Sequence, residues 1–115
     1  MGIVSTPILE RADEIAALLS MLGNTKRLLI MCHLREGEMS VGKIAESVQL
    51  SQSALSQHLA KLRQLKLVET RRDKQTIYYS LSSPVTRNLL STLEELYKEK
   101  RGTLNAGDKA PAATL

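Results

Sequence analysis

The sequence predicts a mainly α-helical domain that carries one two-stranded β-hairpin in its second half. Apolar residues recur at helical spacing through most of the first 66 residues, and the period then changes from about 3.6 to about 2 over residues 67–81. A chain of 115 residues fits one domain with its own core. Because it has no Trp, no Phe and three Tyr, that core must be aliphatic.

Four helices are expected before the hairpin, each marked by a start or a stop signal. Their ranges are about 7–22, 26–35, 41–48 and 52–66. Asn24 or Thr25 can cap the second helix, Ser40 the third and Ser51 the fourth, because Ser, Thr and Asn side chains accept hydrogen bonds from the first free N–H groups of a helix. Gly37 is expected to end the second helix.

Strands are expected over residues 67–72 and 76–81, with residues 73–75 as the hairpin tip. Ser83 followed by Pro84 starts a last helix over about 84–100, which Gly102 ends. Residues 1–6 and 102–115 are expected to be flexible ends of one domain over residues 7–101. A short helix, a tight turn and a longer capped helix form a helix-turn-helix, and the hairpin after it is the wing.

The helix that starts at Gln52 has one apolar side and one polar side. At 100° per residue, Ala54 and the four leucines cover an arc of about 200° to 340°, which must face the core. The polar side is expected to read the major groove of DNA, because Gln pairs with adenine and Ser with either base. We assign to it Ser51, Gln52, Ser53, Ser56, Gln57 and Arg63. Ser56 and His58 point about 200° apart, so they form no nucleophile–base pair; His58 is expected to pack, hydrogen-bonded, between helices.

Basic residues cluster around the hairpin. The chain has a formal net charge of +4, and residues 61–74 hold six basic side chains against two acidic ones. Arg71, Arg72, Lys74 and Gln75 lie at or near the tip, where cations grip phosphates or enter a minor groove. The alternative is an ordinary solvated hairpin tip.

Composition excludes several other classes of function. One cysteine allows no intramolecular disulfide and no multi-cysteine zinc site, and it fits a cytoplasmic protein. No signal peptide and no membrane-spanning stretch is recognised. The chain offers no acid–base pair and no phosphate-binding loop, so we do not expect an enzyme.

Residues 40–83, SVGKIAESVQLSQSALSQHLAKLRQLKLVETRRDKQTIYYSLSS, resemble the ArsR/SmtB family of bacterial winged helix-turn-helix regulators. The resemblance extends over about residues 18–97 and is greatest to the branch that contains BigR, SqrR and HlyU. It implies a homodimer on an imperfect palindrome in double-stranded promoter DNA. The dimer would join the first and last helices, whose apolar stripes a small domain cannot cover alone. These stripes are Ile8, Ala12, Ile15 and Leu19, and Leu89, Leu93, Leu96 and Tyr97.

The metal sites of that family have no full counterpart here. Its arsenic and cadmium site needs two cysteines on the third helix, where this chain has Ser-Val-Gly at 40–42. Its zinc site on the last helix falls on Ser83, Val85, Leu96 and Glu99, which offer one carboxylate. One carboxylate cannot hold a transition metal, so neither a metal nor another cofactor is expected.

Cys32 leaves two interpretations open. It lies on the apolar arc of the second helix, about 100° from His33, which favours a small packed hydrophobe over a Cys–His pair. The sulfur-responsive branch has one cysteine on the second helix and another on the last, and this chain matches only the first, with Lys98 at the second position. A thiol that senses a sulfur or redox signal is therefore the alternative.

Three functions follow, in decreasing order of support. The first is a repressor that a sulfur, redox or unidentified signal releases from DNA. The second is a constitutive regulator that activates by displacing a silencing protein. The third is a winged-helix protein-interaction module without DNA binding. Neither the operator and target genes nor the inducer can be read from the residues.

Overall fold

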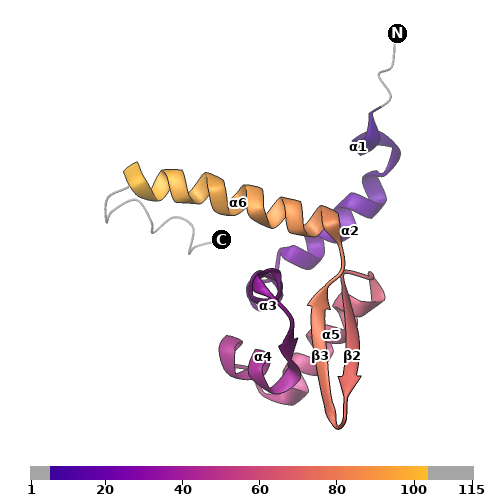
Figure 1. The fold of residues 1–115 in the computed structure, drawn as a ribbon. Helices are drawn as coiled ribbons and strands as arrows, with labels where there is room; N and C mark the ends of the chain where they lie inside the picture. Colours follow the sequence, from indigo (N-terminus) through magenta and orange to yellow (C-terminus); the bar gives the residue numbers. More distant parts are fainter. Residues whose placement is uncertain (1–5, 104–115) are drawn as a thin grey trace. The chain divides into compact units, whose positions relative to one another are not determined.

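The computed structural model describes residues 6–103 and is shown in Figure 1. The chain divides into two compact units, of which the first ends at Ser83 and the second begins at Pro84. The expected domain over residues 7–101 spans both units. Of the flexible ends expected at residues 1–6 and 102–115, residues 1–5 and 104–115 lie outside the described residues. Thr6 instead caps α1, and residues 102–103 belong to α6, so the expected boundaries are wrong at these positions.

The first unit begins with two helices where one was predicted. α1 spans Pro7–Glu10 and α2 spans Ala12–Leu22, separated at Arg11, whose φ of −123° and ψ of 31° are not helical. The prediction of one helix over 7–22 is therefore wrong. The break was missed because it involves a single residue, and the apolar residues on either side of it still follow helical spacing.

α3 spans Thr25–Glu36 and meets α2 at 94°. The side chain of Asn24 accepts a hydrogen bond from the Arg27 N–H at 3.0 Å, which confirms the predicted cap. Gly37 ends the helix with a φ of 155°, a value that favours glycine, and this stop is also confirmed.

The helix-turn-helix consists of α4, Val41–Val48, and α5, Gln52–Gln64. Ser40 caps α4 and Ser51 caps α5, as predicted. Between the helices, Gln49 has a φ of 58° in the left-handed region. α5 ends before the predicted residue 66: the N–H of Lys66 bonds the carbonyl of Arg63 and the N–H of Leu67 that of Leu62, which closes the helix in a Schellman motif.

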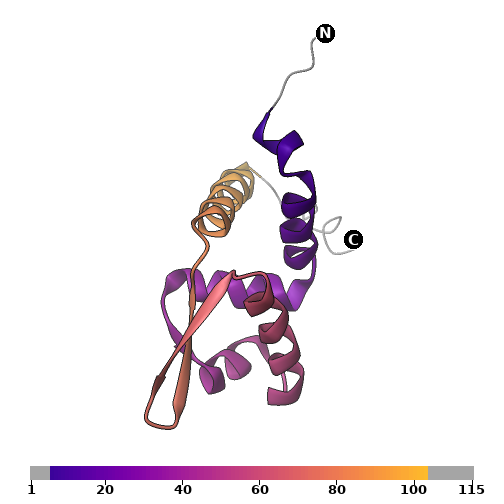
Figure 2. The same cartoon turned by 90° about the vertical axis from the view of Figure 1, so that its right-hand side faces the viewer.

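The sheet has three antiparallel strands in the order β1-β3-β2, where a two-stranded hairpin was predicted. β1 is Met39–Ser40, β2 is Val68–Asp73 and β3 is Thr76–Leu81. β1 was missed because two residues are too short to show alternation. The predicted tip 73–75 is also too long, since Asp73 pairs with Thr76 and only Lys74 and Gln75 form the turn. This tip projects beyond the helices of the unit in both Figure 1 and Figure 2.

The core of the first unit lies between α3, α4, α5 and one face of the sheet, and it is aliphatic as predicted except for Tyr79. Each helix of the helix-turn-helix contributes a buried row. The buried side chains are Ile30, Met31, Leu34, Ile44, Ala45, Val48, Leu55, Leu59, Leu62, Leu67, Val68, Tyr79 and Leu81, with Leu22 from α2. The opposite face of the sheet carries Arg71, which is exposed, and Tyr78, which is half-buried.

The second unit contains α6, Pro84–Thr103. It begins where predicted but continues through Gly102, which was expected to end it, since a glycine inside a helix only lowers its stability and does not force a stop. Within residues 6–103, no single helix is long and apolar enough to cross a membrane, and only α2 and α3 taken together as a bent pair meet that test.

Candidate nucleic-acid interface

α5 turns a polar face to solvent. Leu55, Leu59 and Leu62 are buried on its inner side, so the predicted division of the helix into two sides is confirmed. On the outer side all six residues assigned to DNA reading are exposed: Ser51, Gln52, Ser53, Ser56, Gln57 and Arg63. Leu65, which the same arc placed inward, is 38% exposed because the helix ends before it. The DNA contacts of the exposed side chains stay a prediction.

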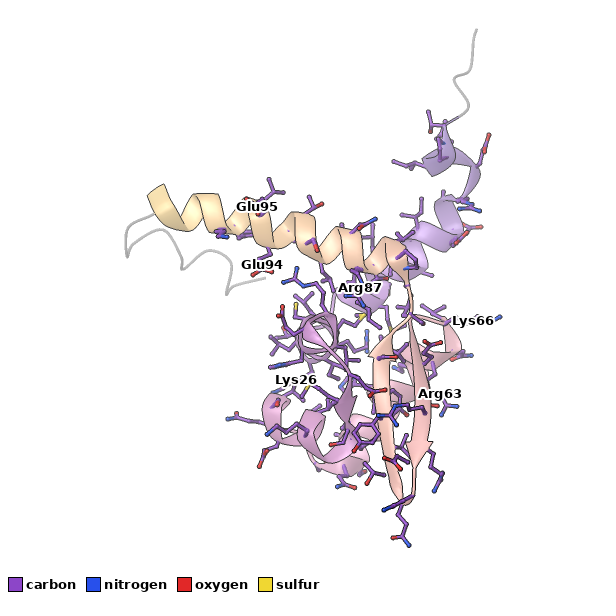
Figure 3. All side chains as sticks on the ribbon, viewed as in Figure 1. Lys26, Arg63, Lys66, Arg87, Glu94 and Glu95 are labelled. Carbon is purple, nitrogen blue, oxygen red and sulfur yellow. The ribbon has the colours of Figure 1, made fainter. Side chains whose placement is uncertain are left out.

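The position of this face is fixed at the start of α5. The hydroxyl oxygen of Ser51 accepts a hydrogen bond from the Ala54 N–H at 3.1 Å. The oxygen is therefore used by the fold, while the hydroxyl hydrogen can still be donated to a phosphate. Arg63 lies near the other end of the helix, as Figure 3 shows. The N-terminal part of the face is thus uncharged and its C-terminal part is basic.

Two neighbouring cations at the start of α3 bind the ends of two other helices, which sequence reasoning missed. The ammonium group of Lys26, labelled in Figure 3, donates to the carbonyl of Val48 at 2.6 Å, the last residue of α4. The guanidinium of Arg27 donates from Nε to the carbonyl of Met21 at 2.9 Å, near the end of α2. Cations at helix C-termini satisfy free carbonyls and oppose the helix dipole. Their position in the chain gives no signal of these partners.

The wing presents its cations on two different faces. Arg72 pairs in register with Ile77 and Arg71 with Tyr78, so the two arginines point to opposite faces of the hairpin. Lys74 lies in the turn with a φ of 60°, and Gln75 beside it is exposed. In the described part of the chain, neither Arg72 nor Lys74 forms an ion pair.

Arg71, by contrast, is already bound. Its Nε and Nη2 donate to Oε2 and Oε1 of Glu38, each at 2.8 Å, and its guanidinium carbon lies 4.5 Å from the centre of the Tyr78 ring. The hydrogen bonds to Glu38 raise the pKa of Arg71 further above its ordinary range. Glu38 lies in the loop before β1, a strand that was not predicted, so no sequence signal linked it to the wing.

Cys32 and His33 lie on α3 and form no site together. Cys32 is exposed, so the prediction that it packs as a buried hydrophobe is wrong. The inner side of α3 is formed by Ile30, Met31 and Leu34 instead. Polar and charged residues stand on several sides of this helix, so its sequence does not mark which side turns inward. Neighbouring atoms still desolvate the thiol and raise its pKa; Arg35 lowers it in part.

His58 is half-buried on the inner side of α5, which agrees with the prediction that it packs; its hydrogen bond stays a prediction. Desolvation lowers the pKa of its ring, and the positive charges of Arg27 and Lys61 lower it further. A neutral ring is therefore favoured at this place. For residues 6–98, whose side chains are described, no group of three His, Cys, Asp or Glu side chains could hold a metal ion.

Each unit exposes apolar side chains on its terminal helices. In the first unit Ile8 and Leu19 are exposed on α1 and α2. In the second unit Leu96 and Tyr97 are exposed on α6. Large aliphatic and aromatic side chains left in water are typical of a surface that another chain covers.

Comparison with known proteins finds one family. Residues 24–70 match the family of bacterial regulatory proteins named arsR. The nodulation protein NolR of Rhizobium meliloti is 54% identical over 76% of this chain and 72% of its own length. The transcriptional activator HlyU of Vibrio cholerae is 48% identical over 76% and 82%. The biofilm growth-associated repressor of Xylella fastidiosa is 39% identical over 76% and 77%.

Solved structures give the same fold. NolR from Sinorhizobium fredii has a TM-score of 0.73 at 52% identity and covers 84% of this chain and 97% of that one. A homodimeric winged helix-turn-helix DNA-binding domain, Mb0332 from Mycobacterium bovis, has a TM-score of 0.73 at 26% identity over 91% and 97%. The predicted winged helix-turn-helix fold is confirmed.

Proposed function

Because this chain belongs to the arsR family of bacterial regulatory proteins, we propose that it is a homodimeric regulator of transcription that binds double-stranded promoter DNA. The observation that carries this proposal is the exposed, uncharged Gln and Ser face of α5 directly after a capped turn, beside a wing with unpaired cations. A protein with these functions works where the DNA is, in the cytoplasm.

The chemistry of the two elements supports different tasks. Gln52 and Gln57 carry amides that can pair bidentately with adenine in the major groove, and the small serines between them let the helix approach the bases. Arg72 and Lys74 at the wing tip suit phosphates or a minor groove, which fix the position of the protein without reading much sequence. Specificity is thus assigned to α5 and much of the affinity to the wing.

A dimer is supported by the exposed apolar faces on the terminal helices and by the homodimeric solved relative. A two-fold dimer places two copies of α5 on the DNA, so its site is an imperfect palindrome with half-sites about one helical turn apart. Leu19→Glu is expected to give monomers in sedimentation experiments, because it places a charge on that face. Lys43→Glu, on the exposed surface of α4, is the control.

The test of DNA binding starts from the pure protein and sheared genomic DNA, since the operator is not known. Fragments that the protein retains are sequenced and then footprinted. We expect a two-half-site footprint and an affinity that falls steeply with salt, by about 0.9 in log–log slope for each phosphate contact. Equal binding to scrambled DNA at physiological salt would refute a sequence-specific regulator and favour the protein-interaction module.

A matched pair of substitutions then tests the reading face. Gln57→Ala is expected to weaken binding by about 1–3 kcal/mol and to relax the preference for one base pair. Gln64→Ala removes the same side chain from the other end of α5, where helix-turn-helix proteins make few base contacts, and is expected to change binding little. Equal effects of the two substitutions would contradict the assignment.

The direction of regulation separates the two leading roles. If the chain is a repressor, like the biofilm-associated relative, deletion of its gene raises expression of the target. A constitutive activator that displaces a silencing protein is the second candidate, and the 48% identity to the activator HlyU favours it. Deletion would then lower expression from a reporter that carries the retained promoter fragment.

The thiol of Cys32 is the candidate receptor for a sulfur or redox signal, because it is exposed and reagents can reach it. Its raised pKa keeps it mostly protonated at neutral pH, so we expect slow reaction with oxidants. Cys32→Ser is tested for DNA release by peroxide, disulfides and persulfides. Identical release curves for the wild type and the variant would exclude this thiol as the sensor.

A further inference from the structure

One face of the sheet carries a side-chain bridge that runs from β2 over β3 to the loop before β1. Tyr78 on the central strand β3 pairs with Arg71 on β2 and with Ser40 on β1. Directly paired residues share one face of a sheet, so Arg71 lies over the Tyr78 ring and reaches Glu38 beyond it. We call the contacts of Glu38, Arg71 and Tyr78 the wing bridge.

The wing bridge has the geometry of a strong surface interaction. Most exposed ion pairs contribute little to stability, but a bidentate arginine–carboxylate pair with ideal distances is the exception. Here two N–H groups donate in parallel at 2.8 Å each, and the guanidinium also lies over an aromatic ring. The arginine side chain is 54% exposed and the glutamate 34%, so water screens the pair only in part.

The bridge also leaves the wing with one fewer unpaired positive charge for binding DNA. A phosphate that approaches Arg71 meets a guanidinium whose charge is already balanced by the carboxylate of Glu38. Arg72, the next residue on the same strand, points to the other face and has no ion pair within the described residues. Of these two adjacent arginines of β2, Arg71 is therefore paired with a carboxylate and Arg72 is not.

We propose that Arg71 is a positioning residue of the wing, which holds the β2–β3 hairpin against Glu38, and that it is not itself a phosphate contact. This inference rests on the proposed DNA binding, in which the cations at the tip are Arg72 and Lys74. The hairpin tip projects beyond the helices of its unit, so its direction depends on the contacts behind it. The wing bridge lies at the third of the six β2–β3 residue pairs counted from the tip, where Ser40 of β1 also pairs with Tyr78. It ties the hairpin to the loop before β1.

The first experiment uses the free protein and needs no DNA. Amide hydrogen exchange of residues 70–78 is followed in the wild type, Glu38→Gln and Arg71→Lys. Both variants lose the bidentate pair, so exchange in the hairpin is expected to be at least about threefold faster. Arg72→Lys is the matched control, with unchanged exchange. Unchanged exchange in Glu38→Gln and Arg71→Lys would overturn the positioning role.

The second experiment measures affinity for a retained DNA fragment over a range of salt. Glu38→Gln removes a negative charge, which by simple electrostatics strengthens binding to DNA. The positioning role predicts the opposite, a weaker affinity by about three- to tenfold, and the same for Arg71→Lys. Arg71→Gln is expected to keep the wild-type slope against salt, whereas Arg72→Gln is expected to lower it by about 0.9.

The outcomes separate the two hypotheses. If Glu38→Gln binds DNA more tightly, or if Arg71→Gln loses about 0.9 in slope while Arg71→Lys binds normally, Arg71 is a phosphate contact and the inference fails. If the wild type retains no DNA, the proposed function fails, and the exchange experiment alone then decides whether the wing bridge positions the hairpin.

Discussion

The recognition helix and the wing are held in place by different forces. α5 is fixed from beneath by three buried leucines and at its start by the cap from Ser51. The wing is held on its outer face by Arg71, an exposed side chain that lies over Tyr78 and pairs with Glu38. Apolar burial is not screened by dissolved ions, whereas an exposed ion pair is. The support of α5, the helix proposed to read sequence, is thus expected to change little with moderate salt, whereas the support of the wing, proposed to bind phosphates, is expected to weaken as the ionic strength rises.

The largest expected effect breaks the support of α5. Leu55 is 0% exposed, and Leu55→Ala is expected to lower the free energy of unfolding by about 2–5 kcal/mol, because it leaves a cavity in the core. Leu65→Ala makes the same change at a side chain that is 38% exposed and should cost less than about 1 kcal/mol. Urea denaturation measures both. Similar losses would show that the core does not carry α5.

The next effect concerns the helix before α5. Lys26→Met removes the bond to the Val48 carbonyl and is expected to cost about 1–2 kcal/mol, since the end of α4 loses a charged partner. Lys43→Met is the control, because Lys43 faces Glu46 at 3.9 Å on an exposed surface and such pairs contribute less than about 0.5 kcal/mol. Thermal or urea unfolding of the two variants compares them. Equal losses of stability in the Lys26 and Lys43 variants would contradict the role of Lys26.

A smaller effect is expected at the cap of α5. Ser51→Ala removes the acceptor for the Ala54 N–H and should lower the free energy of unfolding by about 1 kcal/mol. Ser53→Ala deletes the same hydroxyl two residues later, at the second residue of α5, where the side chain is exposed, and should change stability by less than about 0.5 kcal/mol. Urea denaturation midpoints of the two variants measure the difference. If Ser51→Ala leaves the stability unchanged, the cap does not help to hold α5.

The smallest effect is a pH dependence that belongs to α5 and not to the wing. The pKa of His58 is lowered below its ordinary 6.5, so the folded protein binds this proton less readily than the unfolded chain. The corresponding stability is present above about pH 6.5 and is lost as the pH falls through the lowered pKa. His58→Gln should therefore lose less stability than the wild type between about pH 7.5 and about pH 5. Equal losses, or a ring pKa at or above the ordinary value by NMR, would refute this.

Much of the fold was predictable because its signals are local. Asn24, Ser40 and Ser51 each stand directly before a helix, and each cap is confirmed. The change of period marked the hairpin, and β3 has the predicted bounds. Local rules failed where a feature consists of only one or two residues, at the helix break at Arg11 and at the two-residue strand β1.

The candidate site was predictable in its residues but not in its contacts. The exposed face of α5 follows from helical periodicity alone. The partner of Arg71 does not, because Glu38 is 33 residues away in the chain and adjoins a strand of two residues. The exposure of Cys32 also escaped prediction, because charged and apolar residues are mixed around α3 and no single polar side marks the solvent.

Lys26 and Arg27 make the first turn of α3 a common anchor for two helices. The end of α4 and the end of α2 are bound by side chains one residue apart, so a tilt of α2 strong enough to pull on Arg27 loads the backbone that also carries Lys26. α2, which has an exposed apolar face, and α4 of the helix-turn-helix therefore both end against the same turn of α3. The two side chains that hold these helix ends are joined by a single peptide bond.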